Sequence, residues 1–275
     1  MLWLRLLAAG LLILLTAAAA PDDLPRLGDG RVASVLSGDT LRLSDGREVR
    51  LVGILAPRLA RAGPEGSTIP AWPLALEARD ALARLVDGKA VQLLRAGATQ
   101  DRYGRVLAQL VTHDGRWVQE ALLRDGWVLF DPHADTPGGL EALRQGESAA
   151  RNAGRGLWAD PFYAVRDPDT VGQAMGRFAV VRGRVISASS SPERVYINFG
   201  RDWRQDFTIE IDHHDLAGFR RRHIDPVTLT GRMVEVRGWV ESLNGPMIRV
   251  TFPEPLVALE EAAPPPPEPA AAPTH

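Results

Sequence analysis

Apolar and polar residues alternate through residues 30–43, as in Leu41-Arg42-Leu43, and again through residues 48–52. Alternation with a period of two places the apolar side chains on one face of a half-buried β-strand. Ser44-Asp45-Gly46 lies between the two stretches and is typical of a turn. Together they predict a β-hairpin near the start of the chain.

Helical spacing follows further along. Residues 74–86 carry apolar side chains on one helical face, and residues 118–124 and 140–153 predict two more helices. Residues 91–94 and 106–111 predict strands, whereas the Gly- and Pro-rich residues 59–73 predict a loop. Residues 30–160 therefore predict a small β-barrel with three helices against it.

A second β-rich region is expected at residues 172–259, after a connector at residues 160–171. Its strands are predicted by the patterns of residues 178–185, 195–199, 207–211, 234–240 and 247–250. Several short strands at this spacing indicate a small barrel or sandwich. The expected fold class is α+β, mainly β, with two small barrels in tandem.

The two ends of the chain differ from these domains. Residues 1–20 have a basic start, an apolar centre and a run of alanines, which is the pattern of a cleaved signal peptide. We therefore expect export to the periplasm or the medium and no membrane span in the mature form; the alternative is an uncleaved anchor. Residues 260–275 are rich in Pro and Ala and predict a disordered tail.

The composition is that of a globular protein. The 275 residues are 45% hydrophobic and 24% charged, and the formal net charge is −2. A charge this small gives no overall field for polyanions, so any nucleic-acid site must be a local patch. The chain has no cysteine, which excludes disulfides and thiolate chemistry.

Short motifs in a fixed order make residues 30–160 resemble the staphylococcal nuclease (thermonuclease) family. They are Gly38-Asp39-Thr40, Val49-Arg50-Leu51, Gly53-Ile54, Ala56-Pro57, Asp101, Tyr103-Gly104-Arg105 and Gly156-Leu157-Trp158. The resemblance implies a barrel with three helices and hydrolysis of phosphodiesters. In active members carboxylates hold Ca²⁺, a Glu assists the attacking water, and two arginines bind the phosphate.

The resemblance assigns a role to four residues. Asp39 matches a metal carboxylate, Arg50 and Arg105 match the phosphate-binding arginines, and Tyr103 matches a tyrosine that flanks the nucleotide. Asp39 and the two arginines have alternatives: Asp is common in turns of this kind, and the arginines could be solvated side chains at strand edges or in turns.

Two departures alter the expected chemistry. Leu55 stands where the family has a second metal carboxylate, and Arg58 stands where it has the Glu. Leucine offers Ca²⁺ no oxygen, and arginine cannot act as a base at neutral pH. We therefore expect no cofactor, or Ca²⁺ only if the site survives. We also expect an ion pair between Asp39 and Arg58, with Glu65 as an alternative carboxylate.

Residues 172–259 resemble an OB-type nucleic-acid-binding module. Tyr196, Phe199 and Trp203 are either platforms for stacked bases or core residues, with the core favoured for at least two of them. Arg220-Arg221-Arg222 is either a contact for a nucleic-acid backbone or a solvated surface, the latter favoured. His213-His214-Asp215 is expected in a solvent-facing loop rather than at a metal.

Three functions follow. The first is a catalytically degenerate nuclease relative that binds single-stranded nucleic acid or another anionic ligand, with Arg50, Arg58 and Arg105 as a cationic pocket. The second is a slow or metal-independent nuclease that uses Arg50 and Arg105. The third is a structural envelope protein without a ligand. The sequence does not specify an oligomeric state.

Overall fold

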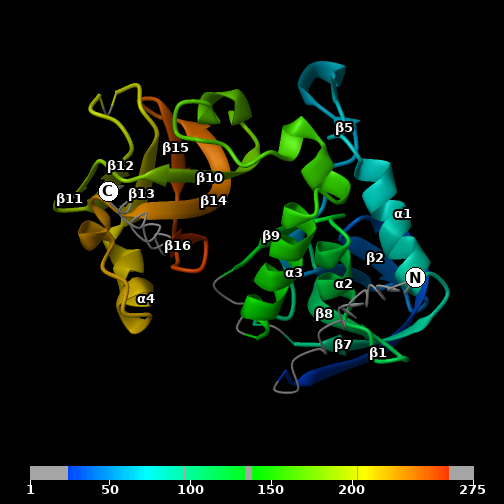
Figure 1. The fold of residues 1–275 in the computed structure, drawn as a ribbon. Coiled ribbons are helices and arrows are strands. Elements are labelled where there is room, and N and C mark those ends of the chain that lie inside the picture. The colour runs from blue at the N-terminus through cyan, green and yellow to red at the C-terminus, as the bar shows by residue number, and fades with distance from the viewer. Residues whose placement is uncertain (1–23, 96, 134–137, 203, 260–275) are drawn as a thin grey trace, which may run out of the picture. The chain divides into compact units, whose positions relative to one another are not determined.

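The computed structural model describes residues 24–95, 97–133, 138–202 and 204–259 (Figure 1). The described residues up to Phe130 and from 138 to Gly156 form a first compact unit, and those at 131–133 and from Leu157 onward form a second. The predicted signal peptide at residues 1–20 and the predicted tail at residues 260–275 lie outside the described residues. No helix in the described part is both long and apolar enough to span a membrane.

The first unit is built on a closed barrel with the strand order β1-β2-β3-β8-β7. Its strands are β1 (Arg26–Ser37), β2 (Thr40–Leu43), β3 (Glu48–Leu51), β7 (Ala90–Leu94) and β8 (Val106–Thr112). The β3–β8 pair is parallel and the others are antiparallel. Leu41 and Leu43 are buried and Arg42 between them is exposed, so the alternation read from the sequence sets the inward face.

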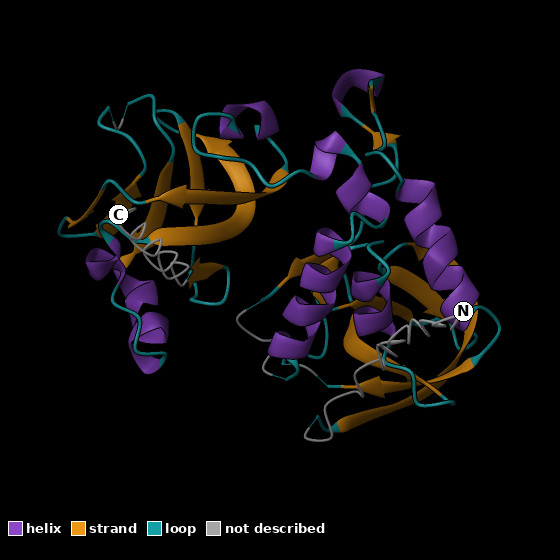
Figure 2. Ribbon diagram, viewed as in Figure 1, coloured by secondary structure: helices purple, strands orange, loops and turns teal. Residues whose placement is uncertain are grey.

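Three helices pack on this barrel: α1 (Ala75–Val86), α2 (Val118–Arg124) and α3 (Leu140–Asn152) (Figure 2). Each buries one face, with Leu82 on α1, Leu122 on α2 and Leu143 on α3 in the same core as the inward strand residues. The barrel with three helices expected from the resemblance is therefore confirmed.

The segment after β4 (Gly53–Leu55) is more ordered than its composition predicts. β4 pairs with β9 (Leu129–Asp131). The predicted loop then contains a small hairpin, β5 (Arg61–Ala62) and β6 (Thr68–Ile69), around the 3₁₀ turn η1 (Pro64–Gly66). The backbone N–H of Trp72 donates to the carbonyl of Arg58 at 2.8 Å and closes the loop at its base.

The second unit is a curled sheet with the order β10-β14-β15-β13-β12-β11, and β16 pairs with β14. Its elements are β10 (Phe178–Arg184), β11 (Ser187–Ser190), β12 (Arg194–Asn198), β13 (Thr208–Asp212), α4 (Leu216–Arg221), β14 (Met233–Ser242), β15 (Pro246–Arg249) and β16 (Leu256–Ala258).

The two ends of this strand order are joined by the chain itself. Only Val185 and Ile186 separate β10 from β11. The Val185 N–H donates to Arg232 O, before β14, and the Ile186 N–H donates to Asn198 O on β12, both at 2.9 Å. The continuous segment β10–β11 thus connects both edges of the curled sheet. The sheet contains one parallel strand pair, β13–β15, as the barrel of the first unit contains the parallel pair β3–β8. The second unit therefore has the expected OB-like topology.

The predicted connector at residues 160–171 lies against the second unit. Arg166 pairs with β10: its N–H donates to Val180 O and its carbonyl accepts from the Arg182 N–H, both at 2.8 Å. The Arg177 guanidinium carbon lies 4.0 Å from the centre of the Phe162 ring. This segment is therefore a structured part of the second unit and not an isolated linker.

Candidate functional site

The Ser-Gly-Asp-Thr turn between β1 and β2 holds Asp39 in a tightly packed position. A side chain at Gly38 would place its Cβ 2.8 Å from the Cβ of Ala56 and 2.9 Å from that of Ala78 on α1. Glycine is therefore required for the turn to lie this close to the helix. Asp39 follows it and is only 5% exposed.

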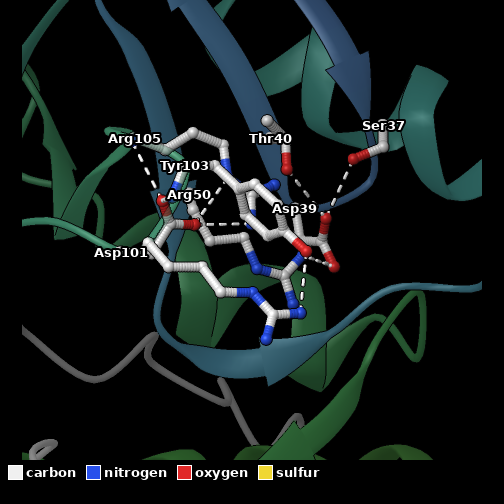
Figure 3. Close-up of polar contacts among 8 residues, drawn as sticks. Ser37, Asp39, Thr40, Arg50, Asp101, Tyr103 and Arg105 are labelled. Carbon is white, nitrogen blue, oxygen red and sulfur yellow. Dashed lines mark hydrogen bonds and ion pairs between the residues drawn. The ribbon is translucent and has the colours of Figure 1, made fainter.

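Four donors surround the Asp39 carboxylate (Figure 3). Oδ1 accepts from the Ser37 hydroxyl at 2.8 Å and the Thr40 hydroxyl at 3.1 Å. Oδ2 accepts from the backbone N–H of Ala56 at 2.8 Å and forms an ion pair with Arg50 Nη1. Each carboxylate oxygen thus has two protein donors, and the Arg50 guanidinium is fixed on the carboxylate.

Strand register explains why Arg50 reaches Asp39. Thr40 and Arg50 are paired across β2 and β3, which places Arg50 next to the turn that holds Asp39. The prediction that Arg58 forms the ion pair with Asp39 is wrong, because Arg50 occupies that position.

Asp101 holds Arg105, the second of the two arginines that are predicted to bind phosphate. Its Oδ1 accepts from the backbone N–H groups of Tyr103 at 2.9 Å and Arg105 at 3.0 Å. Its Oδ2 accepts from Arg105 Nε and pairs with Nη2, both at 2.7 Å. Burial alone would raise the pKa of the Asp101 carboxyl, but these bonds outweigh it and the pKa is lowered.

Tyr103 presents an exposed aromatic ring close to two cations. It is 69% exposed, and its ring centre lies 4.8 Å from the Arg102 guanidinium carbon and 5.5 Å from that of Arg105. The Arg102 Nη2 also donates to the Tyr103 hydroxyl at 2.7 Å. An exposed ring of this kind can stack on a base.

Arg50 and Arg105 come from neighbouring strands. Arg50 pairs with Leu107 in the parallel β3–β8 ladder, and Arg105 immediately precedes β8. Figure 3 shows their side chains together with Asp39, Asp101 and Tyr103. The structure therefore places four of the five predicted site residues, Asp39, Arg50, Tyr103 and Arg105, in the neighbouring strands β2, β3 and β8 or in the turns that lead into them.

The two departing positions lie at the end of β4 and just beyond it. Leu55 is 5% exposed and packs as an apolar residue. Arg58 is exposed, and its guanidinium carbon lies 5.9 Å from the ring centre of Trp72 at the base of the hairpin loop. Glu65 is exposed within η1 of that loop. In the described part of the chain, no three His, Asp or Glu side chains come together in a way that could hold a metal ion.

The remaining candidates lie in the second unit. His213-His214-Asp215 forms a 3₁₀ turn rather than a loop, and His214 pairs with Asp212 at 2.6 Å. Phe199 is 8% exposed and packs on Phe207 with ring centres 5.0 Å apart, so it belongs to the core. Tyr196 lines a cavity, and Trp203 lies outside the described residues.

Arg220 and Arg221 end α4, whose Phe219 is fully buried, and Arg222 pairs with Glu254 at 2.9 Å. The basic run is thus the exposed side of a short helix, as the favoured interpretation of the sequence has it.

Sequence reasoning named Asp39 and Asp101 in the family motifs but did not predict that they hold the site arginines, nor which donors hold Asp39. Ser37, Thr40 and the Ala56 N–H have no chemical signature in the sequence, because their role depends on where Asp39 lies. Asp101 has one: Asp followed three residues later by Gly is typical of a turn in which the side chain accepts backbone N–H groups. Gly104, at φ 77°, completes that turn.

Comparisons with known proteins agree with this fold. The model of the family described as "Staphylococcal nuclease homologue" matches residues 48–160. An uncharacterized endonuclease of Escherichia coli is 35% identical over 136 residues, covering 48% of this chain and 77% of that protein.

Two eukaryotic proteins are similar over shorter shares of their length. Staphylococcal nuclease domain-containing protein 1 of Drosophila melanogaster is 31% identical over 158 residues, or 52% of this chain and 17% of that protein. The probable endonuclease LCL3 of Schizophyllum commune is 34% identical over 125 residues, or 40% of each. With its barrel, its three helices and these relatives, the chain belongs to the staphylococcal nuclease family.

Proposed function

We propose that the first unit is a catalytically degenerate nuclease domain that binds single-stranded nucleic acid, or another anionic ligand, without efficient Ca²⁺-dependent hydrolysis. The observation that carries this proposal is the Asp39 carboxylate, whose two oxygens are committed to four protein donors including Arg50.

The residues at the family's metal position do not fit Ca²⁺. This ion takes 6–8 oxygen ligands. Asp39 would have to exchange the Arg50 ion pair for the metal, and Leu55 brings no oxygen to the same place. Arg58 adds a positive charge where active relatives have a carboxylate.

The same arrangement suits an anion. Arg50 and Arg105 are each held by an aspartate, which reduces the side-chain entropy lost on binding a phosphate. Tyr103 beside Arg105 supplies an exposed ring for a base. Guanidinium groups bind phosphate in a planar, bidentate manner, so a phosphate–base unit fits these three residues.

The names of the relatives favour a second candidate, an active but slow or metal-independent nuclease. The Escherichia coli protein and the Schizophyllum commune protein are both named endonucleases. In this alternative Arg50 and Arg105 would leave their aspartates to bind and stabilise the phosphoryl group that is cleaved.

The metal part of the proposal is tested by restoring the family's acidic residues. The double variant Leu55→Asp/Arg58→Glu is expected to gain Ca²⁺ affinity in isothermal titration calorimetry, whereas the natural chain shows none. A matched control, Leu76→Asp/Arg84→Glu, makes the same charge changes on the exposed side of α1 and is expected to gain none. Ca²⁺ binding by the natural chain at the affinity of the restored variant would contradict the proposal.

The binding part is tested with a dye-labelled single-stranded oligonucleotide in fluorescence anisotropy. Arg105→Ala should weaken binding about tenfold or more, because a hydrogen bond to a charged group contributes about 1.5–3 kcal/mol. Arg116→Ala removes an exposed arginine from the turn after β8 and serves as the control. Equal effects of the two variants would show that only general charge matters.

We also propose that the protein is exported, on the strength of residues 1–20 alone. N-terminal sequencing of the protein recovered outside the cytoplasm should begin near Pro21. A protein that retains Met1 would support the uncleaved anchor.

A further inference from the structure

The outward face of strands β11, β12, β13 and β15 in the second unit carries an unusual row of side chains. Cross-strand pairing places Ser189 opposite Tyr196, Tyr196 opposite Glu210, and Glu210 opposite Arg249. Neighbouring side chains such as Ile197 and Ile209 point into the core. The row therefore faces away from the core, where it could meet a ligand.

A cavity of about 460 Å³ lies over this face. Its lining includes Arg194, Tyr196, Asn198 and Glu210 from the strands, and Leu243 from the β14–β15 turn. Leu243 is 46% exposed although it is a large apolar residue. An exposed apolar side chain beside a half-buried aromatic ring forms a surface suited to a flat ring.

The floor of this cavity holds a buried charge network. Glu210 is 1% exposed, and its Oε1 accepts from Arg249 Nε at 2.9 Å while its Oε2 pairs with Arg194 Nη1 at 3.3 Å. The Arg194 and Arg249 side chains are 36% and 45% exposed. Arg194 also lies opposite Asp212 across β12 and β13, so the two arginines face two carboxylates. The buried Glu210 holds the Arg194 guanidinium at the cavity and also binds Arg249, which does not line it.

Polar groups that could bind the edge of a base lie two residues from Tyr196 and Glu210 along β12 and β13, on the same face of the sheet. Asn198 pairs with Thr208 across β12 and β13, and the Thr208 hydroxyl donates to Asn198 Oδ1 at 3.1 Å. The Asn198 Nδ2 donates to the Ser187 hydroxyl at 3.3 Å. An amide has two N–H groups and two acceptor lone pairs, so one of each is left to read a base through hydrogen bonds.

We propose that this cavity is a second nucleic-acid site, one that takes about one nucleotide of a single strand. The base would lie on Tyr196 against Leu243 with its edge toward Asn198, and the phosphate would contact Arg194. The site is separate from the arginines of the first unit, so it does not depend on the function proposed for them. A ring, an amide and a partly exposed guanidinium group, that of Arg194, together match a nucleotide better than an uncharged sugar, which needs no cation.

The position of the site is tested by photocrosslinking the full chain to a single-stranded oligonucleotide that carries 5-iodouracil, followed by mass spectrometry. A crosslink in the peptide that contains Tyr196 is the expected result. A crosslink at Tyr103 would report the first unit instead, so the two proposals give different products. Crosslinks at Tyr103 without any at residues 194–198 would overturn the second site.

Affinity is measured by anisotropy in a chain that carries Arg105→Ala, so that the first unit contributes little. Tyr196→Ala should weaken binding about 5- to 150-fold, the range that corresponds to 1–3 kcal/mol for a stacked base. Leu243→Ala should also weaken it. Ile186→Ala is the matched control, because Ile186 is 48% exposed in the same unit but does not line the cavity.

Salt dependence checks the role of the cations. Arg194→Gln should lower the slope of log affinity against log salt by about 0.7, the value for one phosphate contact with a single strand. An unchanged slope, or equal effects of Leu243→Ala and Ile186→Ala, would overturn the proposal. Displacement of the oligonucleotide by a neutral oligosaccharide but not by mononucleotides would overturn it as well.

Discussion

Removing the Asp39 carboxylate tests whether it is a structural acceptor for the protein's own donors. In Asp39→Ala, the buried backbone N–H of Ala56 and the hydroxyl of Thr40 lose their acceptor. An unsatisfied buried donor costs about 1–3 kcal/mol. Ser37 is half-buried and the Arg50 side chain is 21% exposed, so water can replace part of what these two lose.

The free energy of unfolding of the first unit should therefore fall by about 3–5 kcal/mol, which is also the usual effect of removing one partner from a buried ion pair. The assay is unfolding of the full chain in urea with pulsed hydrogen exchange and mass spectrometry, read from peptides of β1 to β8. Asp80→Ala is the control, since Asp80 pairs with Arg79 on the surface of α1 and its side chain is 54% exposed. Its effect should stay within about 0.5 kcal/mol.

An opposite result would refute this reasoning. A carboxylate kept for binding a metal is an electrostatic burden in the metal-free protein, and its removal commonly leaves stability unchanged or raises it. If Asp39→Ala changes the free energy of unfolding by less than about 1 kcal/mol in the absence of Ca²⁺, the four donors do not stabilise the fold as argued.

Three further predictions concern stability. Because folding lowers the pKa of Asp101, its ionised carboxylate stabilises the folded state fully above the unfolded pKa of 3.8, and this stabilisation is lost as the pH falls through the folded pKa. Asp101→Asn should therefore lower the free energy of unfolding at neutral pH, and urea titrations in acid should show no difference between the variant and the natural chain. Burial raises the pKa of Asp215, so Asp215→Asn should stabilise the second unit at pH 7, by an amount that shrinks as the pH is lowered toward 4; a constant difference across that range would contradict this cause. Gly126→Ala should lower the melting temperature much more than Gly154→Ala, because both have positive φ but only a Cβ at Gly126 would meet a backbone oxygen, that of Arg155, at 2.3 Å; equal shifts would refute the steric argument.

The barrel of the first unit could be predicted because its burial pattern is local. Leu41-Arg42-Leu43 alternates as a strand does, and residues 75–86 repeat their apolar residues as a helix does. β11 could not be found in this way, because Ser187-Ala188-Ser189-Ser190 has no apolar alternation and is a strand only through its pairing with β12. The hairpin at residues 61–69 could not be predicted either, because its two strands also lack an apolar alternation and are recognised only by their pairing.

The partner of Asp39 was within reach of the sequence but was missed. A hairpin that turns at Ser44-Asp45-Gly46 and pairs Leu41 with Val49 necessarily pairs Thr40 with Arg50. That register brings Arg50 to Asp39. Arg58 lies beyond β4 and outside this hairpin, so the hairpin register does not place it near Asp39. Its positive charge alone was no reason to expect an ion pair with the Asp39 carboxylate.

The cavity of the second unit needed the structure. Tyr196 and Glu210 are fourteen positions apart in the sequence, and only the β12–β13 register places them side by side. The burial of Glu210 depends on the fold around it, which no local pattern encodes. Sequence alone could propose Tyr196 as a base platform but could not separate it from Phe199, which is in the core.

Digestion of denatured DNA and RNA by the purified full chain, in Ca²⁺ and separately in EDTA, tests the central claim most directly. Because Leu55 and Arg58 replace acidic residues and Arg50 occupies Asp39, the account predicts no Ca²⁺-dependent cleavage, and oligonucleotide binding that persists in EDTA. Cleavage that requires Ca²⁺ and is abolished by Arg105→Ala would contradict the account.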